Sequence, residues 1–190
     1  MDEAPVQAYM MASARTDELS DQNRWMSFGN WPPAPNYSEF YLHPNGSLST
    51  RAPTGDEMVS YEFDPENPVP TFGGANLTFE RGPMDQRQIG ERGDYLRFET
   101  DVLTEDVMVA GPVTMQLYAA TDGPDTDFMV KLIDVYPGDA PPSEACTVPM
   151  GGFQMHVAGE IMRGKFRDSF ERPEPMTPGE VTPIHIALRD

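Results

Sequence analysis

Residues 112–137 read PVTMQLYAATDGPDTDFMVKLIDVYP, and this stretch decides the fold class. Its first half alternates: Val113, Met115, Leu117 and Ala119 fall on one side of an extended segment, and Thr114, Gln116, Tyr118 and Ala120 fall on the other. A period of two is typical of a half-buried strand. The second half, Phe128 to Tyr136, is rich in β-branched and aromatic residues and is apolar on both faces. This pattern favours a central strand of a two-sheet sandwich, covered on each side.

The connection between the two halves, DGPDTD, predicts a turn. Gly123-Pro124 interrupts a strand ladder, and aspartates favour turn geometry. We therefore expect residues 112–137 to form a β-hairpin at the centre of an all-β domain.

Further strand-like segments lie on both sides of this stretch: Pro5–Met11, Tyr37–His43, Met58–Phe63, Tyr95–Thr100, Phe153–Phe166 and Val181–Leu188. Twenty prolines and sixteen glycines predict many turns, and only Thr16–Leu19 could begin a single helical turn. At 190 residues the chain is long enough for one domain with a sizeable core. We expect a single all-β domain over residues 1–190, with long irregular loops and little helix.

The chain is strongly acidic, with 31 Asp and Glu residues against 13 Lys and Arg residues. A phosphate backbone or an anionic membrane surface would repel it, so nucleic acid and membranes are poor candidates as partners. The acidic residues are scattered, as on a solubilising or salt-adapted surface. The N-terminal MDEAPVQAY lacks the basic start of a signal peptide, and no later segment could span a bilayer. The residues leave the compartment open.

The chain carries no clear motif for catalysis or metal binding. Residues 25–29 (WMSFG) come nearest to a G-x-S-x-G nucleophile elbow, but the first glycine is missing, so we interpret Ser27 as an ordinary serine. The histidines stand singly, without metal-ligand spacing: His43, His156 and His185. The aspartates Asp122, Asp125 and Asp127 suit a turn better than an EF-hand. The only cysteine, Cys146, suits a small buried hydrophobe. We expect no catalytic residue, metal or cofactor here.

The run YEFDPENPVPTFGG, from Tyr61 to Gly74, resembles the Y-x-x-D-P-x-x-P-V-P-T-x-G-G signature of the cocaine-esterase-like (CocE/NonD) serine hydrolases. Further segments resemble the C-terminal jelly roll of that family in the same order: Gly82–Arg87, Arg92–Asp94, Leu103–Val113, Asp125–Phe128 and Lys131–Pro137. Residues 151–154 and 163–173 are similar to the α-amino-acid ester hydrolase branch. The match covers essentially the whole chain. The same domain occurs in X-prolyl dipeptidyl aminopeptidases.

The resemblance implies a two-sheet jelly-roll β-sandwich, galactose-binding-domain-like, that is the C-terminal accessory domain of a serine hydrolase. In that family an α/β-hydrolase domain carries the catalytic serine and aspartate, and the histidine precedes the jelly roll, so this chain should be inactive alone. The family continues beyond the segment matching Pro178–Val181. We therefore expect a domain truncated at both ends. Its expected partners are the α/β-hydrolase domain of the same chain and a small ester or amide substrate, in an enzyme that could form homo-oligomers.

The connection from Thr71 to Pro83 is too rich in glycine and proline for regular structure, yet it carries Leu77 and Phe79. Loops of this length are often functional, and large apolar side chains on them need cover. In the family, the segment after the glycine pair approaches the hydrolase pocket. By this resemblance the residues lining the acyl or leaving-group side are Gly73, Gly74, Asn76, Leu77 and Phe79. The alternative is that Leu77 and Phe79 plug the end of the sandwich.

A second interpretation of the chain is a carbohydrate-binding or other interaction module without a catalytic parent, because galactose-binding-like jelly rolls often serve that role. Such a module needs exposed aromatic side chains on a concave face or at the loops. The candidates are Trp25, Trp31, Tyr37 and Tyr41, which core or interdomain packing would also explain. An in-frame G-x-S-x-G upstream would support the hydrolase, and an upstream domain of another kind would support the module.

Overall fold

The computed structural model describes residues 5–11, 24–33, 36–78, 80–142 and 148–188. The chain divides into two compact units. The first unit comprises Met1–Gln7, Ser27–Thr71 and Ile89–Gly111, and the second comprises Ala8–Met26, Phe72–Gln88 and Pro112–Asp190. The expectation of one domain truncated at both ends remains a prediction.

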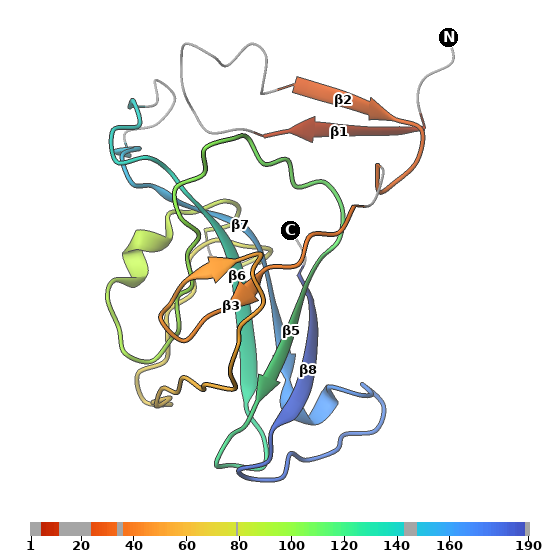
Figure 1. Ribbon diagram of the computed structural model, residues 1–190, viewed down its shortest axis with the longest axis vertical. Helices are drawn as coiled ribbons and strands as arrows, with labels where there is room; N and C mark the ends of the chain where they lie inside the picture. The colour runs from red at the N-terminus through yellow and green to blue at the C-terminus, as the bar shows by residue number, and fades with distance from the viewer. Residues whose placement is uncertain (1–4, 12–23, 34–35, 79, 143–147, 189–190) are drawn as a thin grey trace. The chain divides into compact units, whose positions relative to one another are not determined.

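The regular elements are almost all β-strands (Figure 1). In chain order they are β1 (Val6–Met10), β2 (Arg24–Phe28), β3 (Tyr41–Leu42), β4 (Leu48–Ser49), β5 (Val113–Ala119), β6 (Asp127–Val135), β7 (Gln154–Arg163) and β8 (Thr182–Leu188). The described residues add two short 3₁₀ helices, η1 (Gln86–Ile89) and η2 (Gly164–Phe166). The strands pair as β1–β2, β3–β4, β5–β8 and β6–β7, and the last three pairs are antiparallel. The predicted all-β fold with little helix is confirmed.

The predicted hairpin within residues 112–137 is wrong in its pairing. Both strands form, but β5 pairs with β8, beside which it lies in Figure 1, and β6 pairs with β7. Later residues hold the connection between β5 and β6: the N–H groups of Gly164, Met176 and Gly179 donate to the carbonyl oxygens of Thr126, Pro124 and Thr121. Because these bonds fix the connection to residues 164–179, it links two strand pairs and does not close a hairpin.

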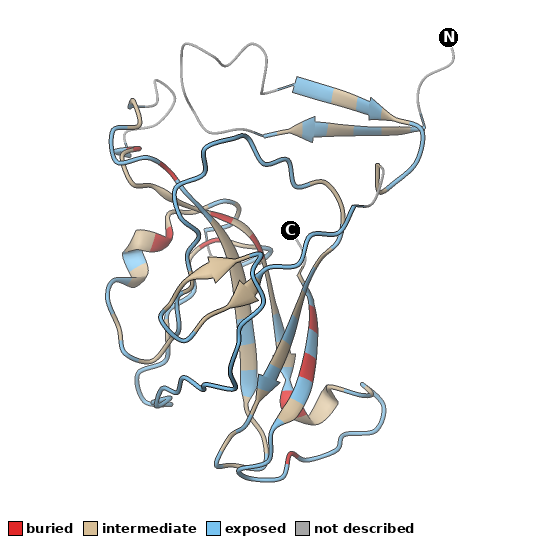
Figure 2. Cartoon of the chain, in the orientation of Figure 1, coloured by how far each residue is buried: buried red, intermediate tan, exposed pale blue. Residues whose placement is uncertain are grey.

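The core of the second unit lies between these two strand pairs. Ile184 and Ile186 on β8 are 0% exposed and are buried together with Met176. The side chains packed around them come from all four strands: Met115, Leu117, Ala119, Phe128, Val130, Met162 and Leu188. Burial of one such isoleucine stabilises the fold by about 1.5–3 kcal/mol. The predicted apolar side of β5 therefore faces the core, opposite the buried bands that Figure 2 shows on β8.

The prediction that β6 is covered on both faces is wrong for the ends of the strand and right for its middle, where Val130–Ile133 are all partly buried. Within the described residues β6 pairs with β7 alone. Phe128 and Val130 face the core, whereas Met129 stays about half exposed and lies opposite the exposed Ile161 of β7. Met129 and Ile161 therefore form an exposed apolar strip on the face of this strand pair that points away from the core.

Two predicted strands do not form in the first unit. Met58–Phe63 and Tyr95–Thr100 have no regular pairing, and Glu99 makes only an isolated bridge to Ser47. Residues that favour β structure extend the chain, but a strand also needs a neighbour for its backbone groups, which no described segment supplies here. The predicted strand Tyr37–His43 is reduced to β3.

The outer strands agree better with the prediction. Pro5–Met11 and Val181–Leu188 contain β1 and β8, and the strand predicted over Phe153–Phe166 ends at Arg163, where η2 follows. Thr16–Leu19 and Cys146 lie outside the described residues. The part of the chain that the structure describes contains no helix with the length and apolarity to cross a membrane.

Candidate functional site

The candidate site is the segment from Gly73 to Gly82 in the second unit, here called the 73–82 loop. Two backbone hydrogen bonds close it: the Gly74 N–H donates to the Gly82 oxygen over 2.9 Å, and the Gly82 N–H donates to the Gly74 oxygen over 3.2 Å. Four predicted pocket residues lie on its described part: Gly73, Gly74, Asn76 and Leu77. Phe79 lies outside the described residues. That these residues line a pocket remains a prediction.

Phe72–Gly74 form the first stem of the loop, and Gly82–Met84 form the second. The first stem accepts only glycine at position 73. Gly73 is buried with φ +69°, in the left-handed region that disfavours other residues. A Cβ there would lie 2.4 Å from the oxygen of Gly82 and 2.7 Å from the Cβ of Met84. The glycine pair therefore lets the two stems of the loop approach each other closely.

Asn76 braces the loop from within. Its Nδ2 donates to the oxygens of Gly73, at 3.0 Å, and Glu80, at 3.2 Å, and its backbone N–H donates to the Gly74 oxygen over 3.0 Å. The Asn76 amide thus joins both sides of the loop. It satisfies backbone oxygens that would be bonded to a neighbouring strand in a regular sheet.

Leu77, one residue further on, is 90% exposed. The alternative that Leu77 plugs the end of the sandwich is therefore wrong. An apolar side chain presented on a braced loop is instead available to another surface.

A buried glutamine clamps the two stems together. Gln86 in η1 is 2% exposed, and its Nε2 donates to the oxygens of Phe72, at 2.8 Å, and Met84, at 3.0 Å. Its Oε1 accepts a 2.8 Å bond from Nζ of Lys131 on β6. Burial lowers the pKa of this Lys131 ammonium. One side chain therefore ties both stems to each other and to the β6–β7 pair.

Asp85 and Arg87, which flank Gln86, hold η1 against the segment before β7. The Arg87 guanidinium bonds the Asp85 carboxylate, and donates to the oxygens of Gly151, at 2.8 Å, and Pro149, at 2.7 Å. Burial would raise the pKa of Asp85, but hydrogen bonds from Arg87 and from the Gln154 backbone hold this pKa below its ordinary value. The segment Gly82–Arg87, one basis of the family resemblance, thus fixes the loop to the second unit.

His156 on β7 lies against the first stem of the loop. It is 7% exposed, and a Cβ on Gly74 would come within 3.1 Å of its Cε1 and 3.6 Å of its Nδ1. Burial is the main cause that lowers the pKa of His156; the positive charge of Lys131 adds to it, and hydrogen bonding to the backbone of Phe72 and Ala158 opposes it. His156 is therefore a packed side chain of β7.

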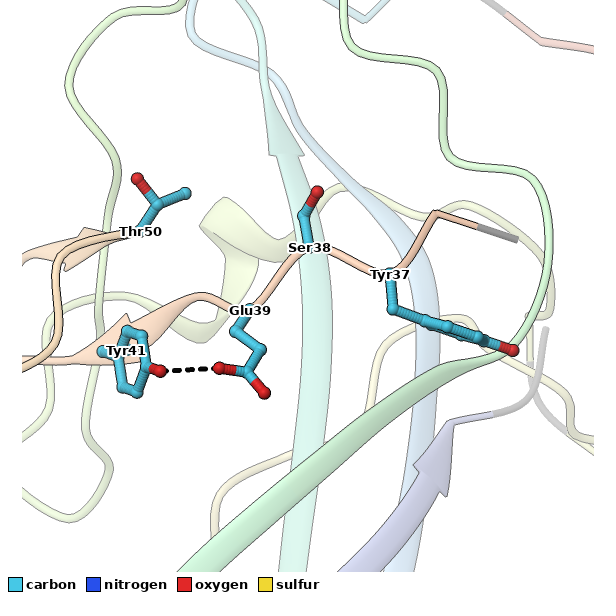
Figure 3. A pocket seen from close by; sticks show the side chains of 5 residues that line it. All are labelled: Tyr37, Ser38, Glu39, Tyr41 and Thr50. Carbon is cyan, nitrogen blue, oxygen red and sulfur yellow. Dashed lines mark hydrogen bonds between the residues drawn. The ribbon is translucent and has the colours of Figure 1, made fainter. Parts of the chain in front are cut away.

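The four aromatic residues proposed for a binding module do not line one common hollow. Tyr37 and Tyr41 line an open hollow of about 440 Å³ in the first unit, together with Ser38, Glu39 and Thr50. Figure 3 shows the Tyr41 hydroxyl bonded to Glu39, over 2.6 Å, and the Tyr37 ring pointing away from Tyr41. Trp25 packs edge-on against Tyr9, and Trp31 against Phe28. Each tryptophan thus contacts another aromatic ring and lies outside the hollow's lining.

The other candidate groups are engaged in local contacts. Asp127 forms a bidentate pair with Arg163, at 2.7 and 2.8 Å, and Asp125 accepts the Lys165 N–H over 3.0 Å. His43 Nε2 lies 2.9 Å from the Ser49 hydroxyl. Over the described ranges, no three His, Cys, Asp or Glu side chains gather in a way that could hold a metal ion. Asp125 and Asp127 thus agree with a connection held by ion pairs to Lys165 and Arg163.

The whole chain, residues 1–190, matches the family described as the X-Pro dipeptidyl-peptidase C-terminal non-catalytic domain. The chain belongs to this family. The resemblance predicted from the sequence motifs is therefore confirmed.

Members and relatives of this non-catalytic domain family occur within larger chains. The cocaine esterase of Rhodococcus sp. (strain MB1 Bresler) is 32% identical over 178 residues, which is 87% of this chain and 29% of the esterase. The crystal structure of an aminopeptidase from the marine sediment archaeon Thaumarchaeota archaeon has 30% identity and a TM-score of 0.81, covering 99% of this chain and 30% of that one. An α-amino acid ester hydrolase structure has 33% identity and a TM-score of 0.76, covering 87% and 29%. The chain thus spans less than a third of the length of these relatives.

Sequence reasoning missed the residues that support the loop in this non-catalytic domain: Gln86, Lys131 and His156. The alternation of β7 gives no signal for His156, because the β6–β7 register is irregular at this point: Leu132 lies opposite Ala158, and the adjacent Ile133 lies opposite His156. Gln86 and Lys131 come from segments far apart in the sequence and meet only in the folded chain. No local pattern could have joined them.

Proposed function

We propose that this chain is the accessory domain of a serine hydrolase, that it packs on an α/β-hydrolase domain of the same polypeptide, and that the 73–82 loop shapes the substrate pocket there. The substrate class is a small ester or amide. The observation that carries the proposal is Leu77, which is 90% exposed on a loop that Asn76 and Gln86 brace from inside.

The bracing supports a contact role for the loop. A leucine on a mobile loop would lose side-chain and backbone entropy on binding, and this loss reduces the gain from burial. Here the stems are already fixed by Gln86 and by the paired glycines Gly74 and Gly82, so Leu77 can be buried against a partner with little further ordering. Family membership and the length of the relatives supply the kind of partner, a hydrolase domain.

The proposed division of labour places all bond chemistry in the hydrolase domain. Its serine attacks the ester or amide carbonyl, a histidine takes the proton, and an oxyanion hole stabilises the tetrahedral intermediate on the way to an acyl-enzyme. The 73–82 loop acts on the unreactive parts of the substrate, because an apolar wall formed by Leu77 discriminates between acyl or leaving groups by size.

The test is the substitution Leu77→Ala in the intact enzyme. We expect kcat/KM for bulky and small acyl substrates to change relative to each other by about tenfold, the range for a change in one apolar pocket contact, while the melting temperature stays constant. Val102→Ala is the matched control, because Val102 is 91% exposed and lies in the first unit. An unchanged ratio in Leu77→Ala would contradict the proposal.

The coding sequence upstream of this chain provides a second, independent check. An in-frame segment with G-x-S-x-G on a strand-to-helix turn supports the hydrolase parent. A different upstream domain, together with saturable binding of saccharides that Tyr37→Ala abolishes, would favour the carbohydrate-binding module instead. The open hollow at Tyr37 and Tyr41 is the place where such binding would be sought.

A further inference from the structure

We propose that His156 is a positioning residue for the 73–82 loop, and that it thereby sets which acyl or leaving groups the proposed pocket accepts. The part of this inference that concerns specificity rests on the proposed function above. The part that concerns the loop stands on the geometry of this chain alone.

The imidazole ring occupies the space between the loop and β7. On one side, a Cβ on Gly74 would lie 3.1 Å from the ring Cε1; on the other, a Cβ on Gly159 would lie 2.9 Å from Nε2. Both neighbours are glycines, so neither carries a Cβ that would press on Cε1 or Nε2 of the ring. The ring therefore limits how near Gly74 can come to β7.

The loop has few other supports at this end. The Gln86 side chain joins the stems to each other and to Lys131 on β6. The backbone N–H of His156 donates to the Met84 oxygen of the second stem over 3.3 Å. The first stem at Gly74 meets β7 through the His156 ring. Removal of this ring would leave the Gly74–Gly82 bridge over an empty space, into which the first stem could move.

The ring works as a neutral spacer. Burial and the neighbouring Lys131 charge keep the pKa of His156 below its ordinary value, so the imidazole is uncharged at neutral pH. Its Nδ1 has no hydrogen-bond partner in the part of the chain that the structure describes. Nδ1 therefore adds no hydrogen bond, and the ring supports the first stem through its packing against Gly74 and through its hydrogen bonding to the backbone of Phe72.

The first measurement concerns the loop and uses the 190-residue chain. In His156→Ala, amide hydrogen exchange at Gly74 and Gly82 should accelerate by about tenfold or more, because these amides open with the loop, while exchange at Ile186 in the core stays unchanged. His156→Phe restores an aromatic ring but not the hydrogen bonding to the backbone of Phe72, so it should recover part of the protection that His156→Ala loses. His185→Ala, an exposed position on β8, is the matched control and should change nothing.

The second measurement concerns specificity and uses the intact enzyme. His156→Ala should shift the ratio of kcat/KM between bulky and small acyl substrates by about tenfold, as Leu77→Ala does, and His156→Phe should return it toward the original value. If His156→Ala does not fold, Gly159→Ala replaces it, because the added methyl group would push the ring at Nε2 toward the loop. A residue that only stabilises the fold would lower the melting temperature and leave this ratio constant.

The outcomes separate this inference from the proposed function. Unchanged exchange at Gly82 in His156→Ala would overturn the inference, whatever the kinetics. A shift of the ratio in Leu77→Ala but not in His156→Ala would keep the proposed function and refute the role of His156 in specificity. Accelerated exchange with no shift in either variant would show that the loop rests on His156 but lines no pocket, which refutes both the proposed function and the specificity claim.

Discussion

Alanine at position 73 should destabilise the second unit more than alanine at any other glycine of the 73–82 loop. Gly73 has φ +69°, where a side chain costs about 1–2 kcal/mol. The new Cβ would also lie 2.4 Å from the Gly82 oxygen, so the stems must separate. Separation removes up to two hydrogen bonds between Gly74 and Gly82, each contributing about 0.5–1.5 kcal/mol. The expected loss is therefore about 2–5 kcal/mol.

Gly82→Ala provides the matched control for this estimate. Gly82 has φ +89°, so alanine meets the same backbone strain of about 1–2 kcal/mol, but among the described residues no atom beyond its chain neighbours lies within 4 Å of its Cβ position. Gly74→Ala should fall between the two, because its Cβ would lie 3.1 Å from the His156 ring. The order of destabilisation is thus position 73, then 74, then 82.

Urea unfolding of the 190-residue chain, followed by near-ultraviolet circular dichroism, measures these differences as shifts in the free energy of unfolding. Gly73→Ala should exceed Gly82→Ala by about 1–3 kcal/mol, the contribution of the separated stems. Amide exchange at Gly82 should also accelerate in Gly73→Ala, because exchange detects a local opening of the loop that need not involve the core. Equal losses for the two variants would refute the claim that close contact between the stems requires glycine at position 73.

Further predictions concern the stability of the core, the pH dependence of that stability and the hydrolytic activity of the isolated chain. Ile184→Ala should lower the free energy of unfolding by about 2–5 kcal/mol in a urea titration, against less than about 0.5 kcal/mol for Val102→Ala. The pKa of His156 in the folded chain lies below the 6.5 of the unfolded chain, so stability from the neutral ring is complete above pH 6.5 and is lost as the pH falls below it. His156→Phe should therefore lessen the fall of the urea midpoint between about pH 7.5 and about pH 5.5, a range above the titration of aspartates such as Asp127. The isolated chain should not hydrolyse p-nitrophenyl esters, and a serine-reactive phosphonate should leave it unlabelled in mass spectra; labelling of Ser27 would contradict this.

The alternation in residues 113–119 was enough to predict a strand and to choose the face that meets the core. Met115 and Leu117 pack on Ile184 and Ile186 as the period of two requires. The pattern describes each residue's surroundings but not its partner. The same reasoning therefore joined β5 to β6, whereas β5 pairs with β8 and β6 pairs with β7. Register between distant strands depends on contacts that no local window contains.

The candidate site was predictable to a similar depth. The glycine and proline content of Thr71–Pro83 predicted an irregular segment, and the structure adds the positive φ values and the close approach of Gly73 to Gly82. The support under the loop was not predictable, because His156 and Lys131 come from different strands and Gln86 from a 3₁₀ helix. In the first unit, Met58–Phe63 has the composition of a strand but no neighbour to pair with among the described segments, so composition alone gave the wrong result there.

The pairing of β5 with β8 also determines the order in which the chain can fold during synthesis. Val113 emerges from the ribosome long before Leu188, which lies opposite it. Loops of that length must close before the pair gains any stability, so the strands wait for their partner. Until Ile184 and Ile186 arrive, the apolar side of β5 has nothing to pack on. A ribosome that stalls before β8 would therefore hold a nascent chain with most of its apolar strands and no core, the kind of intermediate that aggregates or needs a chaperone.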